Sequence, residues 1–252
     1  LILEAAIDNQ DVTITGGSMT TDAVSALITN SSTIKLNTPG VEILRFKEAT
    51  GNSTIDLANA QDATLVAFDS EDTYDMTFSN VNQDSVIQLG LDVNGAVQLT
   101  AVHGAENGTY TLSYNSVGGA DDAVQVNLAD TDAGATAVLD IDSIETVTLK
   151  HVKESGGTDG TGTPAFENHT ISLAGSTNAT NKIKLVHTGG ASGKTITYAT
   201  SGGVANINAI DAGASDSAIS FGVAARLNTA AMTITGTDGN DTIGMEHGND
   251  VL

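Results

Sequence analysis

The 252-residue sequence has no cysteine, no tryptophan and only nine lysine and arginine residues. Without cysteine, the fold cannot depend on disulfide bonds. Aromatic residues make up 4% of the chain, so we expect thin interiors filled by valine, isoleucine, leucine and alanine. No run approaches the ~18 consecutive apolar residues of a membrane-spanning helix, and the first residues lack the basic segment and cleavage pattern of a signal peptide. We therefore expect no membrane span.

Acidic residues dominate the charge. The chain has 31 aspartates and glutamates and a net charge of −22. This excess argues against a nucleic-acid surface and against binding to anionic lipid, because both ligands carry the same sign of charge. It suits an extracellular protein that binds divalent cations. Most of the carboxylates are expected only to maintain a solvated, salt-tolerant surface.

Short strands are predicted at a nearly constant interval. Triplets of the form apolar-x-apolar recur about every ten to twelve residues, with a less regular stretch before the second half of the ladder. The segments between them are rich in Gly, Asn, Asp, Ser and Thr, which favour turns. The triplets are 44–46, 55–57, 66–68, 76–78, 87–89, 97–99, 171–173, 183–185, 196–198, 207–209, 219–221 and 232–234.

The chain is therefore predicted to be all-β, although residues 21–28 would also suit a turn or two of helix. A β-sandwich has turns every eight to twelve residues, but about a dozen nearly equal steps are more typical of a solenoid. With two or three strands per coil, each coil would take roughly 22 to 36 residues. We favour a parallel β-helix, or β-solenoid, and keep β-sandwich domains as the alternative.

Two weakly similar segments suggest an internal division. Residues 40–47 and 143–150 each place an apolar-Glu pair, with Glu42 and Glu145, ahead of a strand that ends in lysine. An exposed charge at the strand end and a ligand role are equally good interpretations of these glutamates. The expected organisation is a first solenoid block at 1–150, a Gly-rich loop or insertion at 151–170, a second solenoid block at 171–235, and a different repeat at 236–252.

The last seventeen residues hold the most specific motif. Residues 236–244, Gly-Thr-Asp-Gly-Asn-Asp-Thr-Ile-Gly, fit the calcium-binding nonapeptide G-G-x-G-x-D-x-U-x, where U is apolar, except that Thr237 replaces the second glycine. Residues 245–252 follow in the same phase and keep a Gly, the Asp and the apolar position. Two consecutive units in register are hard to obtain by chance; the alternative is an Asn-Asp-Gly turn of an ordinary hairpin. Because the sequence stops inside the second unit, we expect it to be part of a longer protein.

The residue types of the nonapeptide match the chemistry of calcium. Glycines allow turn conformations that leave backbone carbonyls free to point at a cation. Calcium takes six to eight oxygen ligands, so carbonyls and carboxylates of neighbouring turns can share one ion. The apolar eighth position is expected to point inward on a short strand. The predicted ligands are the carboxylates of Asp241, Asp250 and Asp238, with carbonyls near Gly236, Gly239 and Gly248.

Other motifs are weaker. Asp211 and Asp216 flank a Gly-Ala-Ser segment that we predict to be a turn, and they are a further candidate calcium pair because like charges this close are costly without a cation. An enzyme is not indicated. The five histidines are dispersed along the sequence, and there is no His-x-x-x-His pair, Gly-x-Ser-x-Gly elbow or Walker lysine.

Several phrases together resemble a known family. They are the Thr-, Ala-, Gly- and Asn-rich strand ladder, Ile-Glu-Thr-Val-Thr-Leu at 144–149, Ile-Asp-Ala-Gly-Ala-Ser at 210–215, and the nonapeptides that follow a Met-Thr-Ile-Thr-Gly strand. In these features the chain is similar to bacterial surface-layer (S-layer) proteins of the RTX type. The resemblance implies type I secretion with a signal at the far C-terminus, calcium-dependent folding outside the cell, and a β-roll that continues the solenoid. Thr237, Met245 and Glu246 depart from the glycine pattern, which implies weak or capping first turns.

The function that this resemblance implies is structural. The protein would form a calcium-dependent S-layer lattice on the cell surface, with Ca²⁺ as its cofactor, copies of itself as partners and cell-surface polysaccharide as a further partner. An RTX adhesin or biofilm-matrix protein is the first alternative. A carbohydrate-active β-helix enzyme, with paired carboxylates as acid and base, is the second.

Overall fold

The computed structural model contains twenty short β-strands and, among the residues it describes, no helix. Consequently none of these residues belongs to a helix long and apolar enough to cross a membrane. The described residues are 2–7, 11–17, 22–28, 33–47, 51–69, 74–90, 108–119, 121–129, 136–141, 143–153, 166, 168–174, 183–198, 207–221 and 232–244.

The strands form two sheets of ten strands each, and the chain alternates between them. Sheet A consists of the odd-numbered strands β1 (Ile2–Ile7), β3 (Ala23–Ile28), β5 (Ile43–Lys47), β7 (Leu65–Asp69), β9 (Val86–Leu89), β11 (Ala123–Leu128), β13 (Thr146–His151), β15 (Ile183–Gly189), β17 (Ile207–Ser215) and β19 (Thr233–Thr235). Sheet B consists of the even-numbered strands β2 (Asp11–Thr13), β4 (Thr33–Asn37), β6 (Ser53–Asn59), β8 (Met76–Val81), β10 (Thr109–Tyr114), β12 (Ala137–Ile141), β14 (His169–Ala174), β16 (Thr195–Tyr198), β18 (Ala218–Phe221) and β20 (Thr242–Ile243).

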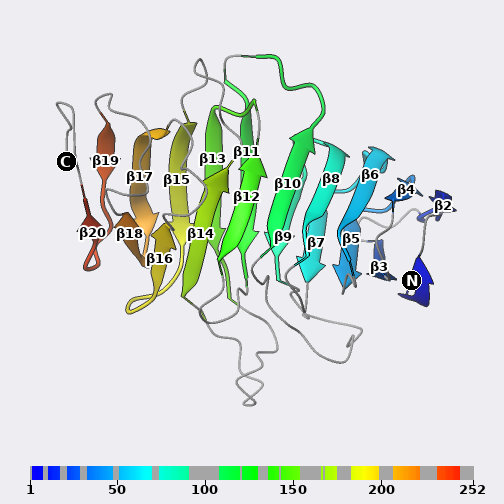
Figure 1. Ribbon diagram of the computed structural model, residues 1–252, viewed down its shortest axis with the longest axis horizontal. Helices are drawn as coiled ribbons and strands as arrows, with labels where there is room; N and C mark the ends of the chain where they lie inside the picture. The colour runs from blue at the N-terminus through cyan, green and yellow to red at the C-terminus, as the bar shows by residue number, and fades with distance from the viewer. Residues whose placement is uncertain are drawn as a thin grey trace.

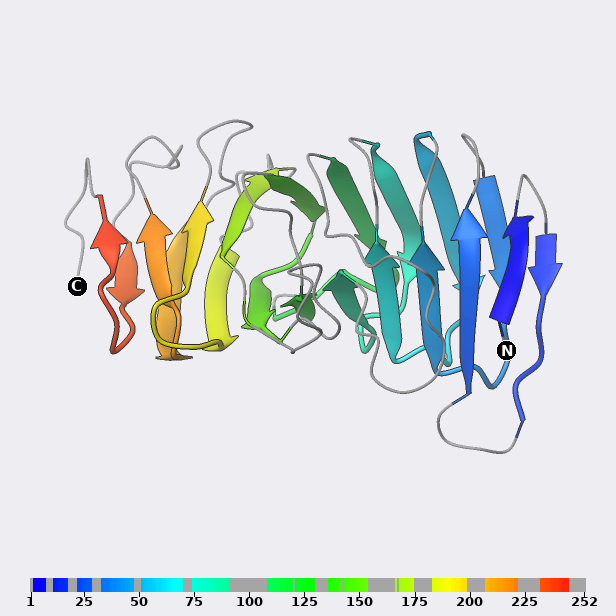
Figure 2. The same cartoon turned by 90° about the horizontal axis from the view of Figure 1, so that it is seen from below.

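All pairings between these strands are parallel, and each strand pairs with the strand two places along the chain. One coil therefore contributes one strand to each sheet, and the coils follow one another along a single axis (Figures 1 and 2). The expected parallel solenoid is confirmed. The alternative, a sandwich of antiparallel hairpins, is wrong for this chain.

Coil length explains the regular and irregular parts of the sequence. Leu65 pairs with Ile43 before it and Val86 after it, so neighbouring coils differ by 22 and 21 residues. The step from Ile87 to its partner Val126 is 39 residues, because extra chain enters that coil. Strand β13 still pairs directly with β15, so the ladder of sheet A continues across the segment that separates the two predicted blocks.

The core is a single layer of side chains enclosed between the two sheets. Residues alternate in burial along the strands, as in β6 and β13, where every second side chain faces the core. The few aromatic rings pack against one another. Phe78 lies 6.3 Å from Phe46 and 5.7 Å from Phe68, measured between ring centroids. The thin aliphatic interior expected from the composition thus contains a short aromatic stack.

The sequence-based strand predictions largely match these elements. Ten of the twelve triplets lie within strands, 232–234 overlaps β19, which begins at Thr233, and 97–99 falls outside the described residues. The helix considered for residues 21–28 is wrong, because 23–28 form β3. Val24, Ala26 and Ile28 are buried at alternate positions, but Ser25 is buried as well, and the apolar Ala23 and Leu27 of the other set hide this period in the sequence.

Candidate functional site

The chain crosses between the sheets along two edges of the solenoid. The first edge consists of the connections from a sheet A strand to the next sheet B strand, described at 51–52, 74–75, 90, 108, 129, 136, 152–153, 166, 168, 190–194, 216–217 and 236–241. The second edge consists of the return connections, described at 14–17, 22, 38–42, 60–64, 82–85, 115–119, 121–122, 143–145 and 232. The nonapeptide turn lies on the first edge and stacks on the turns of the preceding coils.

The first nonapeptide folds as a turn followed by a strand. Residues 236–241 connect β19 to β20, and Ile243 of β20 packs against the core. A side chain at Gly236 would place its Cβ 2.5 Å from Asp241 Oδ2, closer than any non-bonded contact allows. A side chain at this position would therefore force the Asp241 carboxylate to move away from its hydrogen-bond donors.

Asp241 is held by three donors from the protein. Its Oδ2 accepts a hydrogen bond from the backbone N–H of Thr237 at 2.7 Å. Its Oδ1 accepts one from the Thr237 hydroxyl at 2.8 Å and one from the backbone N–H of Ile219 at 2.9 Å. An ionised carboxylate has about four acceptor positions, so most of its capacity is already used.

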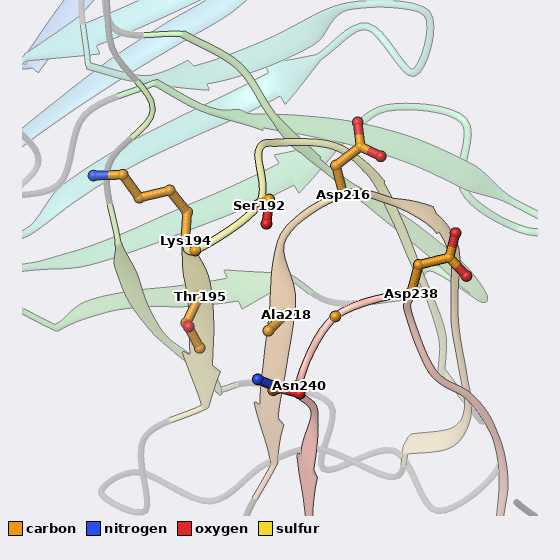
Figure 3. Close-up of a pocket in the computed structure, with 9 residues that line it drawn as sticks. Ser192, Lys194, Thr195, Asp216, Ala218, Asp238 and Asn240 are labelled. Atoms are coloured by element: carbon orange, nitrogen blue, oxygen red, sulfur yellow. The ribbon is translucent and has the colours of Figure 1, made fainter.

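A polar groove of about 440 Å³ lies on the first edge beside this turn (Figure 3). Turns of three consecutive coils line it, so residues far apart in the sequence meet there. The exposed carboxylates of Asp216 and Asp238 lie on one side, whereas the Lys194 side chain extends away on the other (Figure 3). Gly239 and Asn240 complete the nonapeptide part of the lining.

The remaining predicted ligands do not join this group. Asp211 lies in β17, where its carboxylate forms an exposed ion pair with Lys184 at 3.0 Å. The expectation that Asp211 and Asp216 flank a turn is wrong, because residues 213–215 continue β17 and only 216–217 connect it to β18. Gly248 and Asp250 lie outside the described residues.

The carboxylates described at the first nonapeptide do not form a calcium site by themselves. Calcium requires six to eight oxygens. Within the described ranges, no group of three or more His, Cys, Asp or Glu side chains is placed to hold a metal. Asp241 is committed to protein donors, and Asp211 is paired with a lysine. These side chains therefore do not supply the six to eight oxygens on their own, and the predicted carbonyl ligands near Gly236 and Gly239 stay a prediction.

The second edge has carboxylate contacts that the sequence did not reveal. The Glu42 carboxylate accepts the backbone N–H of Asp22 in the preceding coil at 2.7 Å, and Glu145 accepts that of Asp122 at 3.0 Å. In both cases the backbone is paired as well, since each glutamate N–H donates to the carbonyl of the same aspartate at 3.1 Å. The two similar segments thus share one structural role, in which a glutamate caps the preceding coil. The only sequence signal was the repeated apolar-Glu pair.

Three histidines that are dispersed in the sequence are buried close together in the interior. His151, His169 and His187 are each at most 1% exposed. The rings of His151 and His169 are 4.5 Å apart, and His151 Nδ1 shares a hydrogen bond of 2.7 Å with Ser217 Oγ. His187 Nε2 shares one of 2.8 Å with the Tyr198 hydroxyl. His151 ends β13, His169 begins β14 and His187 lies within β15. The stacking of the coils therefore brings the three residues together.

Burial keeps two of these histidines neutral. Burial, and after it the nearby His151 and Lys194, lowers the pKa of His169 from 6.5 to about 3. Burial also lowers the pKa of His187 to about 4, although the carboxylates of Asp241 and Asp211 act in the opposite direction. His169 and His187 are therefore uncharged at neutral pH.

Comparison with known proteins identifies no relative. No protein-family model matches the chain, and no match was found among curated proteins or among solved structures.

Proposed function

We propose that the protein is a structural component of a bacterial cell surface, an RTX-type S-layer protein that assembles with copies of itself and binds Ca²⁺ through its tail. The observation that carries the proposal is the direct passage of a two-sheet parallel solenoid into a nonapeptide turn on the same edge. Solenoids are stiff, quasi-one-dimensional bodies suited to building extended assemblies. The net charge of −22 also makes association responsive to a divalent cation.

In this proposal the protein is extracellular and exported by a type I system. Calcium is assigned to the second nonapeptide, which contains Gly248 and Asp250, and to the turns that stack on it. No catalytic role is assigned to any residue. Cell-surface polysaccharide is a further partner in the assembled layer.

Negative-stain microscopy of the purified protein tests the proposal. Ordered sheets are expected after calcium is added, and a chelator should disperse them. Asp250→Asn should weaken the calcium response. Asp84→Asn, at an exposed turn position on the second edge, removes the same charge and should leave the response unchanged. Dispersed particles at all calcium concentrations, or sheets that form equally well in chelator, would contradict the proposal.

One feature of sheet B favours an adhesin as the second candidate. Outward-facing hydroxyl residues stand in register on consecutive strands, at the spacing of about 4.8 Å between strands. Such columns suit a ligand with a repeating surface, such as insoluble polysaccharide or ice. The columns are Thr33, Thr54, Thr77 and Thr111 in the first half and Thr170, Thr197, Ser220 and Thr242 in the second.

Sedimentation assays separate this candidate from the lattice. An adhesin would remain dispersed in calcium and co-sediment with insoluble polysaccharide or partition into growing ice. The double substitution Thr54→Lys and Thr77→Lys should abolish that binding, because each long lysine side chain would project beyond the neighbouring hydroxyl groups and keep a flat ligand from contacting them. Thr148→Lys, which changes an outward position of sheet A, is the matched control. Equal binding by both variants would remove the adhesin from consideration.

A further inference from the structure

The departure of Thr237 from the nonapeptide pattern has a structural explanation. Its hydroxyl donates to Asp241 Oδ1 at 2.8 Å and accepts the backbone N–H of Gly239 at 2.9 Å. Its own N–H donates to Asp241 Oδ2 at 2.7 Å. One threonine therefore ties the beginning, the middle and the end of the six-residue turn to one another.

Asp241 carries this arrangement into the preceding coil. Its Oδ1 also accepts the N–H of Ile219 in β18, the strand on which β20 pairs. The hydroxyl of Thr237 and the N–H of Ile219 thus meet at the same oxygen. Because both bonds are made to an ionised acceptor, they are stronger than bonds between neutral groups.

The same position is used in the solenoid body with no nonapeptide around it. Asn52, Asp75 and Asn168 each immediately precede a sheet B strand, as Asp241 does. Their Oδ1 atoms accept the N–H of Asp75, Thr109 and Thr195, respectively, at 3.0, 2.9 and 2.9 Å. Each of these donors belongs to the next coil, whereas Ile219, the donor to Asp241, belongs to the preceding coil. Two of the three body residues are uncharged asparagines, so the position couples adjacent coils through hydrogen bonds to the backbone.

We infer that the 236–241 turn is a metal-independent junction between the solenoid and its tail, closed by the Thr237 hydroxyl. The side chain that breaks the glycine pattern supplies within the turn the contacts that hold Asp241 in place. The turn then presents a finished coil, on which later turns can stack whether or not calcium is present. This inference stands on the hydrogen bonds of Thr237 and does not depend on the proposed lattice.

Amide hydrogen exchange of the whole chain in excess chelator tests the inference. The N–H groups of Ile219 and Thr237 are expected to be protected in chelator, and added calcium should change their protection less than about twofold. Wild-type amides that exchange in chelator as fast as those of an unfolded peptide, and become protected only with calcium, would overturn it.

Substitutions at Thr237 identify the group responsible. Thr237→Val keeps the shape of the side chain but removes the hydroxyl, and in chelator it should reduce the protection of the Ile219 amide about tenfold, the effect of losing hydrogen bonds of this strength. Thr237→Ser keeps the hydroxyl and should retain wild-type protection. The amide of Leu185, in the core of β15, reports the fold and should be unchanged in both variants. Equal Ile219 protection in the valine and serine variants would show that the hydroxyl does not close the turn.

Failure of this test is distinguishable from failure of the proposed function. Microscopy reports whether copies of the chain assemble in calcium, whereas hydrogen exchange in chelator reports a local contact within one chain. A protein that forms no sheets can still show the Thr237-dependent protection. A protein that forms calcium-dependent sheets can likewise lack it.

Discussion

Acidification is expected to destabilise the protein through its buried histidines. His169 and His187 have folded-state pKa values of about 3 and about 4, against 6.5 for an exposed histidine. At a pH between the folded-state pKa of each histidine and 6.5, the unfolded chain binds a proton that the folded chain does not. The free energy of unfolding therefore falls as the pH falls below about 6.5. At pH 5 each histidine lowers the free energy of unfolding by about 2 kcal/mol relative to pH 8. The loss from His187 is complete below about pH 4, and that from His169 below about pH 3.

Single substitutions isolate this effect from the titration of the many carboxylates. Glutamine at position 187 does not titrate, and its amide can replace the hydrogen bond to Tyr198. His187→Gln should therefore lose about 2 kcal/mol less stability than wild type between pH 8 and pH 5, whatever its stability at pH 8. His169→Gln should behave in the same way.

Urea unfolding followed by circular dichroism at both pH values measures this difference. The comparison is between the pH dependence of each variant and that of wild type, with similar urea m-values in all samples. The reasoning is refuted if wild type and His187→Gln lose the same free energy of unfolding on acidification, because the folded-state pKa of His187 would then be ordinary.

Three further substitutions test the packing and the edges. Glu145→Ala should lower the free energy of unfolding by about 1 kcal/mol in urea titrations, because the Asp122 N–H loses its side-chain acceptor. Glu145→Asp should lose the same stability, because the shorter side chain does not reach that N–H, and wild-type stability in this variant would contradict the assignment. Phe78→Ala should cost about 3–5 kcal/mol by the same measurement, since the ring is fully buried between other aromatic rings; a smaller loss would indicate a core that collapses into the space. Lys184→Ala should change stability by less than about 1 kcal/mol, because its ion pair with Asp211 is half exposed, and a larger loss would contradict that assessment.

The sequence could predict the strands because the core is only one layer deep. Each coil buries alternate side chains between the two sheets, so nearly every strand repeats the apolar-x-apolar pattern. The pattern is harder to see where both faces of a strand carry apolar residues, as in β3, and where inserted chain lengthens a coil, as between Ile87 and Val126. Which residues form a strand depends on local alternation of apolar residues. The number of residues between strands depends on the lengths of the connecting loops, which can vary at the edges of the solenoid without disturbing its core.

The contacts of the candidate site were less predictable because they join residues one coil apart. Glu42 reaches Asp22, and Asp241 reaches Ile219, at separations of 20 and 22 residues. No local motif encodes such a partner; it follows only from the length of the coil. The histidine contact spans two coils, because His151 pairs with Gly189 and Gly189 with Ser215. His151 and Ser217 are therefore 66 positions apart, and the first of the two steps is lengthened to 38 residues, which hides their stacking in the sequence. The nonapeptide was predictable because its glycine and its aspartate act within one turn.

In-register stacking also explains how an acidic chain can form a continuous solenoid. Equivalent residues of neighbouring coils are separated by only about 4.8 Å, so a column of identical charges would be strongly unfavourable. On the outer face of sheet B, Asp11 stands opposite Lys35, which in turn stands opposite Asp56. On the first edge, the Asn52 side-chain amide donates to the Asp75 carboxylate at 3.4 Å, and the Asp75 N–H donates to Asn52 Oδ1 at 3.0 Å. Lys35 and Asn52 therefore occupy positions where carboxylates would otherwise stack. Because a shift by one coil would set aspartate against aspartate, the same arrangement favours the observed register.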